Sequence, residues 1–185
     1  CYGKLTGSIS RAMKFSTRCR YGLRLMIELA RALKRQKLVR LGKIAKVTGL
    51  SINYLTQLAI PLKSAGLVVG VSGRNGGFHL TRPPEEIRLS EIVVALDGPV
   101  SVTDCVVSPD VCLNSAFCEA RMIWSILSGT MLEVLESYTL ADLIDRDRIN
   151  RIREKHADLP YLDPDRLLNE KEDGEIHGCP KAAGK

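Results

Sequence analysis

Residues 41–80 constrain the fold of this chain more than any other stretch. An apolar-periodic segment ends at Gly49, and Ser51 opens a second one two residues later. Glycine suits the left-handed backbone that ends many helices, and a serine side chain caps the free N–H groups that begin the next helix. Two helices joined by so short a turn form a helix-turn-helix, whose second helix can enter the major groove of DNA.

Two short apolar runs, 67–71 and 78–80, follow the second helix and are separated by a glycine-rich cluster at 72–77. The Asn-Gly and Gly-Gly pairs in this cluster favour the tight turn of a β-hairpin. The sequence therefore predicts a mainly α fold built on a winged helix-turn-helix, in which the hairpin is a small β wing.

The second helix carries polar side chains near its amino end, where recognition helices contact base edges. Asn and Gln side chains can read adenine through two hydrogen bonds, whereas Ser and Tyr can bond phosphates. Lys63 is expected to contact the DNA backbone. The candidate DNA-binding residues on this helix are Ser51, Asn53, Tyr54, Gln57 and Lys63.

Pro61 lies inside the same helix. Proline lacks the N–H group of a helical hydrogen bond and clashes with the preceding turn, at a cost of about 3 kcal/mol in a helix interior. We therefore expect a kink here, or a helix that ends near Ile60. By their spacing, four leucines on this segment belong to the core: Leu55, Leu58, Leu62 and Leu67.

Charge is distributed unevenly along the chain. Residues 1–90 contain 17 Lys and Arg against 3 Asp and Glu, whereas residues 91–185 contain 10 against 18. The basic half includes the helix-turn-helix, where a polyanion would dock. A solvated basic surface without a partner is the alternative, but the coincidence of charge and motif favours double-stranded DNA.

A strongly amphipathic helix is predicted from Thr17 to Leu33. Its apolar stripe is core by spacing and comprises Tyr21, Leu25, Leu29 and Leu33. Three arginines near its start, Arg18, Arg20 and Arg24, either reach phosphates or form a solvated face.

A short helix is predicted at 89–97 and a long one at about 117–137. The long helix carries an apolar stripe made of Met122, Ile126, Met131 (or Leu127), Leu132 and Leu135, with Trp124 beside it. Because the winged domain supplies no obvious second layer for it, we expect it to pair with its copy in a homodimer. Packing against the first helix is the alternative, and both arrangements can hold at once. Two copies also suit two DNA half-sites.

The chain thus divides into five predicted parts. These are an N-terminal extension (1–12), a winged helix-turn-helix domain (13–98), a cysteine-bearing cluster loop (99–120), a dimerisation helix region (117–145) and a charged, disordered tail (146–185). No apolar run approaches a membrane span, and residues 1–12 lack the apolar core of a secretory signal. We therefore expect a cytoplasmic protein without a membrane partner.

Three cysteines, Cys105, Cys112 and Cys118, are separated by six and five residues. A structural zinc site usually places two cysteines two to four residues apart, and a disulfide is disfavoured in the cytoplasm unless it senses redox state. An iron–sulfur cluster held by three thiolates and one other group fits the wider spacing. Unligated thiols are the remaining alternative.

Six stretches, read in order with the three cysteines, resemble a known family. They are MKFSTRCRYGLR at 13–24, IAKVTGLSINYLTQL at 44–58, AGLV at 65–68, GRNGGFHL at 73–80, RPPEEI at 82–87 and TLADL at 139–143. In these stretches the chain resembles the Rrf-type winged-helix transcriptional regulators, the IscR/NsrR/CymR-like family.

The resemblance implies a homodimeric bacterial transcription factor, usually a repressor, that binds a palindromic operator. It implies that Ser51, Asn53, Thr56 and Gln57 face the major groove. The wing would enter the minor groove, where its candidate residues are Ser72, Arg74, Asn75 and Gly76. It also implies that Cys105, Cys112 and Cys118 ligate a 2Fe–2S or 4Fe–4S cluster that gates operator affinity.

The fourth ligand of such a cluster is not evident. Some family members use a histidine three residues after the last cysteine, where this chain has Arg121. Others use an acidic residue on the first helix of the opposing subunit, where this chain has Arg20 and the neighbouring Cys19 is a candidate. Further candidates are Asp104, Asp110 and Glu119.

Two alternatives to a cluster-gated regulator stay open. One is a regulator without a cluster, controlled by thiol redox state or by a protein partner. The other is an interaction module without operator specificity. An enzyme is not expected, because the sequence shows no Ser/His/Asp set, phosphate loop or paired catalytic carboxylates.

Overall fold

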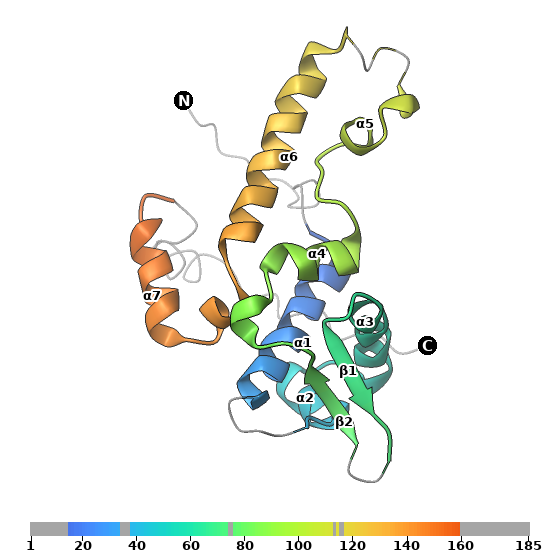
Figure 1. Ribbon diagram of the computed structural model, residues 1–185, viewed down its shortest axis with the longest axis vertical. Helices are drawn as coiled ribbons and strands as arrows, with labels where there is room; N and C mark the ends of the chain where they lie inside the picture. The colour runs from blue at the N-terminus through green and yellow to red at the C-terminus, as the bar shows by residue number, and fades with distance from the viewer. Residues whose placement is uncertain (1–14, 34–37, 74–75, 113, 115–116, 160–185) are drawn as a thin grey trace, which may run out of the picture. The chain divides into compact units, whose positions relative to one another are not determined.

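The computed structural model describes residues 15–33, 38–73, 76–112, 114 and 117–159 (Figure 1). The chain divides into two compact units, Cys1–Ile144 and Asp145–Lys185. The predicted extension at 1–12 and the tail at 160–185 lie outside the described residues. Among the described residues, no helix is long and apolar enough to span a bilayer.

Helices dominate both units, which confirms the mainly α fold. The first unit contains α1 (Thr17–Leu33), α2 (Leu41–Thr48), α3 (Ile52–Ser64), β1 (Val68–Val71), β2 (Gly77–Leu80), η2 (Pro84–Glu86), α4 (Leu89–Asp97), α5 (Asp104–Val107), η3 (Pro109–Val111), α6 (Glu119–Ser137) and η5 (Leu140–Leu143). The second unit contains α7 (Arg146–Lys155).

The turn between α2 and α3 forms as its residues predict. Gly49 adopts a φ of 73°, and its N–H donates to the carbonyl of Ala45, which closes α2. The Ser51 hydroxyl oxygen accepts a hydrogen bond from the backbone N–H of Tyr54 at 3.2 Å, which caps α3. This turn therefore sets the direction in which α3 leaves α2.

The wing is an antiparallel pair in which Val68 lies opposite Leu80 and Val71 opposite Gly77. Val39, just before α2, adds a bridge to this hairpin, because its N–H donates to the carbonyl of Phe78 at 3.0 Å. In return, the N–H of Phe78 donates to the carbonyl of Val39 at 2.8 Å. The hairpin is thereby fixed to the start of the helix-turn-helix.

The core lies where α1, α3 and α4 meet. Its fully buried side chains include Leu25, Met26, Leu29, Leu55, Leu58, Leu62, Leu67, Ile87, Ile92 and Leu140. Of the seven leucines predicted in the core of the winged domain, six are therefore confirmed, and Leu33 is half-buried at the edge together with Tyr21. On α2, Ile44 is buried and Val47 is 65% exposed.

Of the two outcomes expected at Pro61, a kink or a helix end near Ile60, the helix end is wrong, because α3 continues through Pro61 to Ser64. Leu58 and Leu62, on either side of the proline, are both fully buried. Burying each leucine contributes about 1.5–3 kcal/mol, which together offsets the cost of the proline. Tertiary packing therefore overrides local propensity here.

The prediction of one apolar stripe on α6 is also wrong, because the apolar side chains occupy two faces. Met131 and Leu135 are half-buried, and Leu135 packs against the core. Met122 and Ile126 are each 60% exposed. At about 100° per residue, the nine steps from 122 to 131 place these two side chains on opposite sides of the helix.

The predicted disordered tail is wrong for its first ten residues, which form α7. The side chain of Asp145 caps this helix by accepting hydrogen bonds from the N–H groups of Asp147 and Arg148 at 3.0 and 3.3 Å. Ile149 and Ile152 lie on one face at helical spacing. The prediction of disorder rests on the high charge of the segment and overlooks both the Asp145 cap and the spacing of the two isoleucines.

A pair of glycine substitutions tests the packing of α1 on α4. A Cβ at Gly22 would lie 2.8 Å from Cδ2 of the buried Leu96, whereas one at Gly42 would meet only Ile52 Cδ1 at 3.7 Å. We expect Gly22→Ala to lower the free energy of unfolding by about 1–3 kcal/mol. The control Gly42→Ala should be neutral or stabilise by up to about 1 kcal/mol. Urea unfolding curves measure both, and equal effects would show that α1 and α4 do not pack this closely.

Candidate nucleic-acid interface and cysteine loop

Helix α3 presents one polar face to solvent. Its inner face is buried and consists of Leu55, Leu58, Ala59 and Leu62. Its outer face is exposed and consists of Asn53, Thr56, Gln57, Ile60 and Lys63, at the three- and four-residue spacing of a helical stripe. Because the inner face is locked into the core, the direction of this outer stripe is fixed.

Some polar side chains on this stripe already form hydrogen bonds within α3, and others do not. The Thr56 hydroxyl donates to the carbonyl of Ile52 at 2.9 Å, and the Ser51 hydroxyl oxygen is used in capping. No hydrogen bond within the described part of the chain engages the side-chain amides of Asn53 and Gln57. These two amides are the groups on α3 best suited to read base edges.

Tyr54, predicted among the DNA-contacting residues, packs toward α1 instead of standing on the outer stripe. It is half-buried, and its ring meets that of Tyr21 edge to face, with the centroids 6.0 Å apart and the planes at 86°. Sequence reasoning missed this contact, because nothing in the local pattern pairs two residues so far apart in the chain.

A groove of about 300 Å³ separates α3 from the wing. It is lined by Thr56, Ala59, Ile60, Lys63, Gly70, Val71, Ser72 and Phe78. Among the predicted wing residues, Ser72 is exposed, whereas Arg74 and Asn75 lie outside the described residues. A Cβ at Gly76 would overlap the carbonyl oxygen of Val71, so the turn itself requires glycine there.

The helix-turn-helix is electropositive. Neither α2 nor α3 contains an acidic residue, and Lys43, Lys46 and Lys63 are all exposed. The outer face of α3, the groove and the wing thus offer an amide-bearing ridge beside basic side chains, a combination suited to a polyanion with readable edges.

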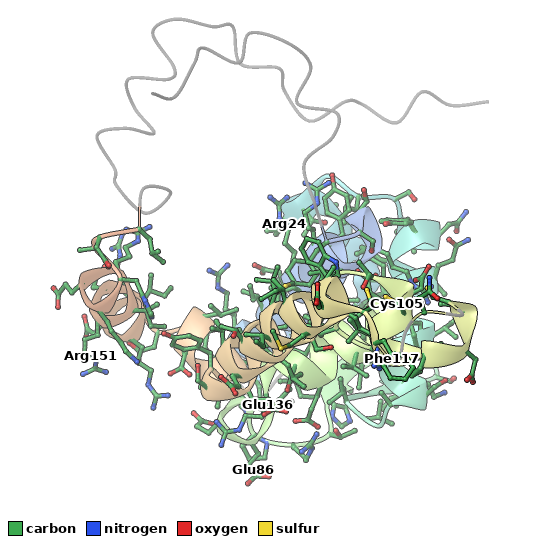
Figure 2. All side chains as sticks on the ribbon, turned by 90° about the horizontal axis from the view of Figure 1, so that it is seen from above. Arg24, Glu86, Cys105, Phe117, Glu136 and Arg151 are labelled. Carbon is green, nitrogen blue, oxygen red and sulfur yellow. The ribbon has the colours of Figure 1, made fainter. Side chains whose placement is uncertain are left out.

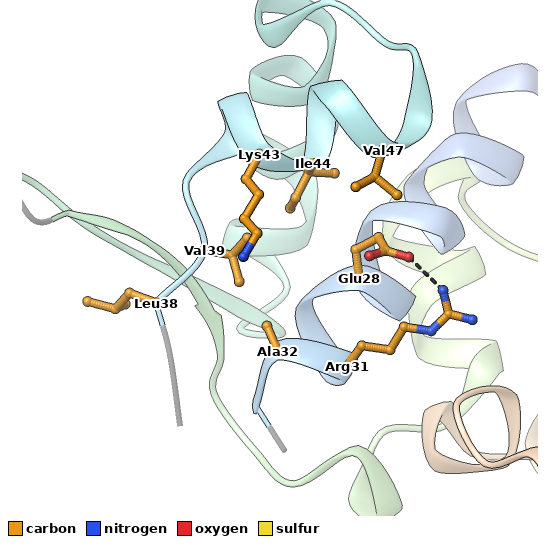
Figure 3. A pocket seen from close by; sticks show the side chains of 8 residues that line it. All are labelled: Glu28, Arg31, Ala32, Leu38, Val39, Lys43, Ile44 and Val47. Carbon is orange, nitrogen blue, oxygen red and sulfur yellow. Dashed lines mark hydrogen bonds and ion pairs between the residues drawn. The ribbon is translucent and has the colours of Figure 1, made fainter. Parts of the chain in front are cut away.

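A second hollow, of about 190 Å³, lies between α1, α2 and Val39 (Figure 3). Its polar side chains are Lys43 and the ion pair between Glu28 and Arg31, whose oxygen and nitrogen lie 2.7 Å apart. Its single carboxylate, that of Glu28, is paired with Arg31.

The three cysteines lie on the connector between α4 and α6. Cys105 is half-buried on α5, Cys112 is exposed after η3, and Cys118 is half-buried directly before α6. This connector is tied to α6 at two points. The Arg121 Nε donates to the carbonyl of Cys105 at 2.8 Å, and the N–H of Val102 donates to the Ser128 hydroxyl at 3.1 Å.

A metal centre on the connector would require these thiols to converge. Thiol side chains are the donors that iron–sulfur clusters prefer. Among the described residues, however, no three His, Cys, Asp or Glu side chains are gathered so that they could hold a metal ion. The donor set therefore suits a cluster in its chemistry, while this conformation of the connector does not bring the thiols together.

Cys19, the candidate fourth ligand, is a buried residue of α1. It is 4% exposed, and burial, with a smaller contribution from the Asp97 carboxylate, raises the pKa of its thiol to about 11. Both features disfavour ligation by its thiolate. The other candidates, Asp104, Asp110 and Glu119, are exposed.

Comparisons with known proteins agree with this arrangement of elements. The family model Rrf2, described as an iron-dependent transcriptional regulator, matches residues 15–146. The HTH-type transcriptional regulator CymR of Bacillus subtilis is 38% identical over 131 residues, which are 71% of this chain and 89% of that protein. The HTH-type transcriptional regulator IscR of Cereibacter sphaeroides is 36% identical over 138 residues, 73% of this chain and 89% of that protein.

A solved structure gives the same result. The structure of CymR, the global cysteine regulator of B. subtilis, superposes with a TM-score of 0.61 at 37% identity and covers 72% of this chain and 97% of that one. The resemblance seen in the sequence is confirmed, and the chain belongs to the Rrf2 family of transcriptional regulators.

Proposed function

We propose that this protein is a cytoplasmic, homodimeric regulator, acting as a repressor, that binds a palindromic operator through α3 and the wing. The observation that carries the proposal is the outer stripe of α3, where two unengaged amides stand on a helix without acidic residues. In this proposal, the state of the cysteine-bearing connector sets the affinity of the regulator for its operator. The proposal includes no catalytic activity.

Each DNA-binding residue has a role in this proposal. Asn53 and Gln57 read bases in the major groove, with Thr56 beside them. Ser51 and Lys63 contact phosphates, and the wing residues Ser72, Arg74, Asn75 and Gly76 enter the minor groove. The groove between α3 and the wing then accommodates a strand of the DNA backbone.

Base reading is tested with Gln57→Ala and Asn53→Ala. We expect each to weaken operator binding by about 1–3 kcal/mol and to leave binding to a scrambled duplex unchanged, because base contacts carry the sequence information. Footprinting of the promoter upstream of the protein's own gene identifies the operator, and fluorescence anisotropy measures both affinities. We expect a protected palindrome of about 25 base pairs, as two half-sites require.

Lys63→Ala is the matched control on the same helix. Because a phosphate contact is independent of sequence, this change should weaken binding to both duplexes equally. Equal losses of affinity for both duplexes in all three variants would contradict base reading by the two amides.

The proposal of a homodimer rests on α6. This helix of 19 residues buries only Ser128 within its own chain. Its exposed large apolar side chains are Met122, Ile123, Trp124, Ile126, Leu127 and Val134. A surface of this kind is typical of a protein–protein interface. Two identical copies of α6 can bury it against each other in a two-fold dimer.

The dimer is tested with two adjacent substitutions that introduce the same charge. Ile126→Glu places a carboxylate in the apolar face, and we expect it to weaken dimerisation by at least about 100-fold, because a charge buried without a partner costs several kcal/mol. Ser125→Glu, rotated by about 100° around the helix, should leave the dimer intact. Sedimentation equilibrium measures both, and identical behaviour of the two variants would place the interface elsewhere.

The cysteine-bearing connector is the proposed sensor. We propose that Cys105, Cys112 and Cys118 hold an iron–sulfur cluster, with the fourth ligand unassigned. Such a cluster would cross-link the connector and would make it responsive to oxidants and nitric oxide. The chain's own residues then carry the change onward, because Arg121 and Ser128 tie this connector to α6.

The sensor is tested by anaerobic purification. We expect brown protein with visible absorption bands and with iron and sulfide in comparable amounts. Cys112→Ala should abolish the colour, and the control Cys19→Ala, in the core, should retain it. Colourless protein free of iron under these conditions would remove the cluster and leave a thiol-based redox switch as the alternative.

A further inference from the structure

The amino-terminal half of α1 holds two arginines over one aromatic ring. The guanidinium carbons of Arg20 and Arg24 lie 5.9 and 5.6 Å from the centroid of the Tyr21 ring. Cation–π contacts at this distance hold each guanidinium group while leaving N–H donors available. The two arginines are thus kept together, one helical turn apart.

The Tyr21 ring also connects this pair to the recognition helix. It meets the ring of Tyr54, which lies in the first turn of α3 and whose N–H is the one capped by Ser51. Both tyrosines are half-buried and pack against the core. The ring pair is therefore a fixed platform, and Arg20 and Arg24 stand beside the amino end of α3.

Folding alone does not account for this arginine pair. Two like charges four residues apart on a helix are mutually destabilising. Arg31, further along the same face, is neutralised by Glu28 at 2.7 Å, but Arg20 and Arg24 have no acidic partner among the described residues. Arg20 donates only a long hydrogen bond, of 3.4 Å, to the Thr17 hydroxyl.

The carboxylate that lies beside the start of α1 belongs to Asp97, the last residue of α4, and it is already hydrogen-bonded to Ser16. The Asp97 carboxylate accepts hydrogen bonds from the N–H and the hydroxyl of Ser16, and the first turn of α1 itself contains no acidic residue. Figure 2 labels Arg24 and Glu86 at separate places on the molecule. An exposed, oriented pair of guanidinium groups without a carboxylate suits an external anion, and arginine matches phosphate oxygens in geometry.

We propose that Arg20 and Arg24 form a phosphate clamp that grips the DNA backbone beside the major groove, and that Tyr21 is its positioning residue. The proposal rests on the proposed function, because it assumes that α3 enters the groove. It adds a third contact region, on α1, to the recognition helix and the wing. The clamp contributes affinity and register and carries no sequence preference.

The salt dependence of binding tests the clamp. Full-length wild type, Arg20→Ala and Arg24→Ala are titrated with operator and scrambled duplexes from 50 to 200 mM KCl by fluorescence anisotropy. We expect each substitution to weaken binding to both duplexes by the same factor, about 5–10-fold. The slope of log K against log salt should fall by about 0.9 for each phosphate that a subunit no longer neutralises. Arg31→Ala, paired on the same helix, is the matched control and should not change either quantity.

The role of Tyr21 needs a separate pair of variants. Tyr21→Leu should reproduce the reduced slope, whereas Tyr21→Phe, which retains the ring, should restore binding relative to Tyr21→Leu. If Tyr21→Leu displaced α3, it would instead reduce operator binding more than scrambled-duplex binding. That result would overturn the positioning role of Tyr21.

The clamp and the proposed function fail in different ways. If wild type binds the operator and the two arginine variants keep its slope and affinity, the clamp is overturned and the regulator stands. If wild type binds neither duplex at any salt concentration, both are overturned.

Discussion

The burial of the leucine face of α3 against α1 is the contact on which the remaining structure depends. Leu55, Leu58 and Leu62 are fully buried, and Leu25 and Leu29 of α1 share the same core. A helix with one face locked has no rotational freedom, so the outer stripe with Asn53 and Gln57 points in a single direction. The same packing holds the last turn of α3 together across Pro61 and keeps Tyr54 against Tyr21.

Helix α6 is anchored at both ends, which in the proposed mechanism connects the cysteine-bearing connector to the winged domain. In its amino-terminal half and at its middle, Arg121 and Ser128 hold the cysteine-bearing connector. At its carboxyl end, the Arg88 guanidinium donates to the carbonyl of Glu136 at 3.1 Å, and the chain after α6 bridges back beside Arg88. Figure 1 shows α6 running from the winged domain to α5. A change in the connector therefore acts on the helix that carries the exposed apolar face.

Local signals predicted most of the fold, and non-local packing accounts for what they missed. Gly49 and Ser51 act through their own backbone, so their roles were readable from neighbouring residues. The survival of α3 beyond Pro61 depends on leucines that meet other helices, and the division of α6 into two faces depends on where α4 and α5 pack. The contact of Tyr21 with Tyr54 and the burial of Cys19 belong to the same class. No pattern in the sequence specifies them.

The arrangement of the basic residues in the first unit lowers the stability of the fold through repulsion between like charges. Arg20 and Arg24 repel each other across one helical turn, and Lys43, Lys46 and Lys63 face solvent without an acidic residue on α2 or α3. Arg31 shows that the chain can neutralise an arginine on this helix where neutrality serves the fold, because Glu28 is placed one turn before it. Within the described residues, no such carboxylate stands beside Arg20 and Arg24. This is the arrangement that the proposed phosphate contact requires, since bound phosphates would remove the repulsion that the free protein bears.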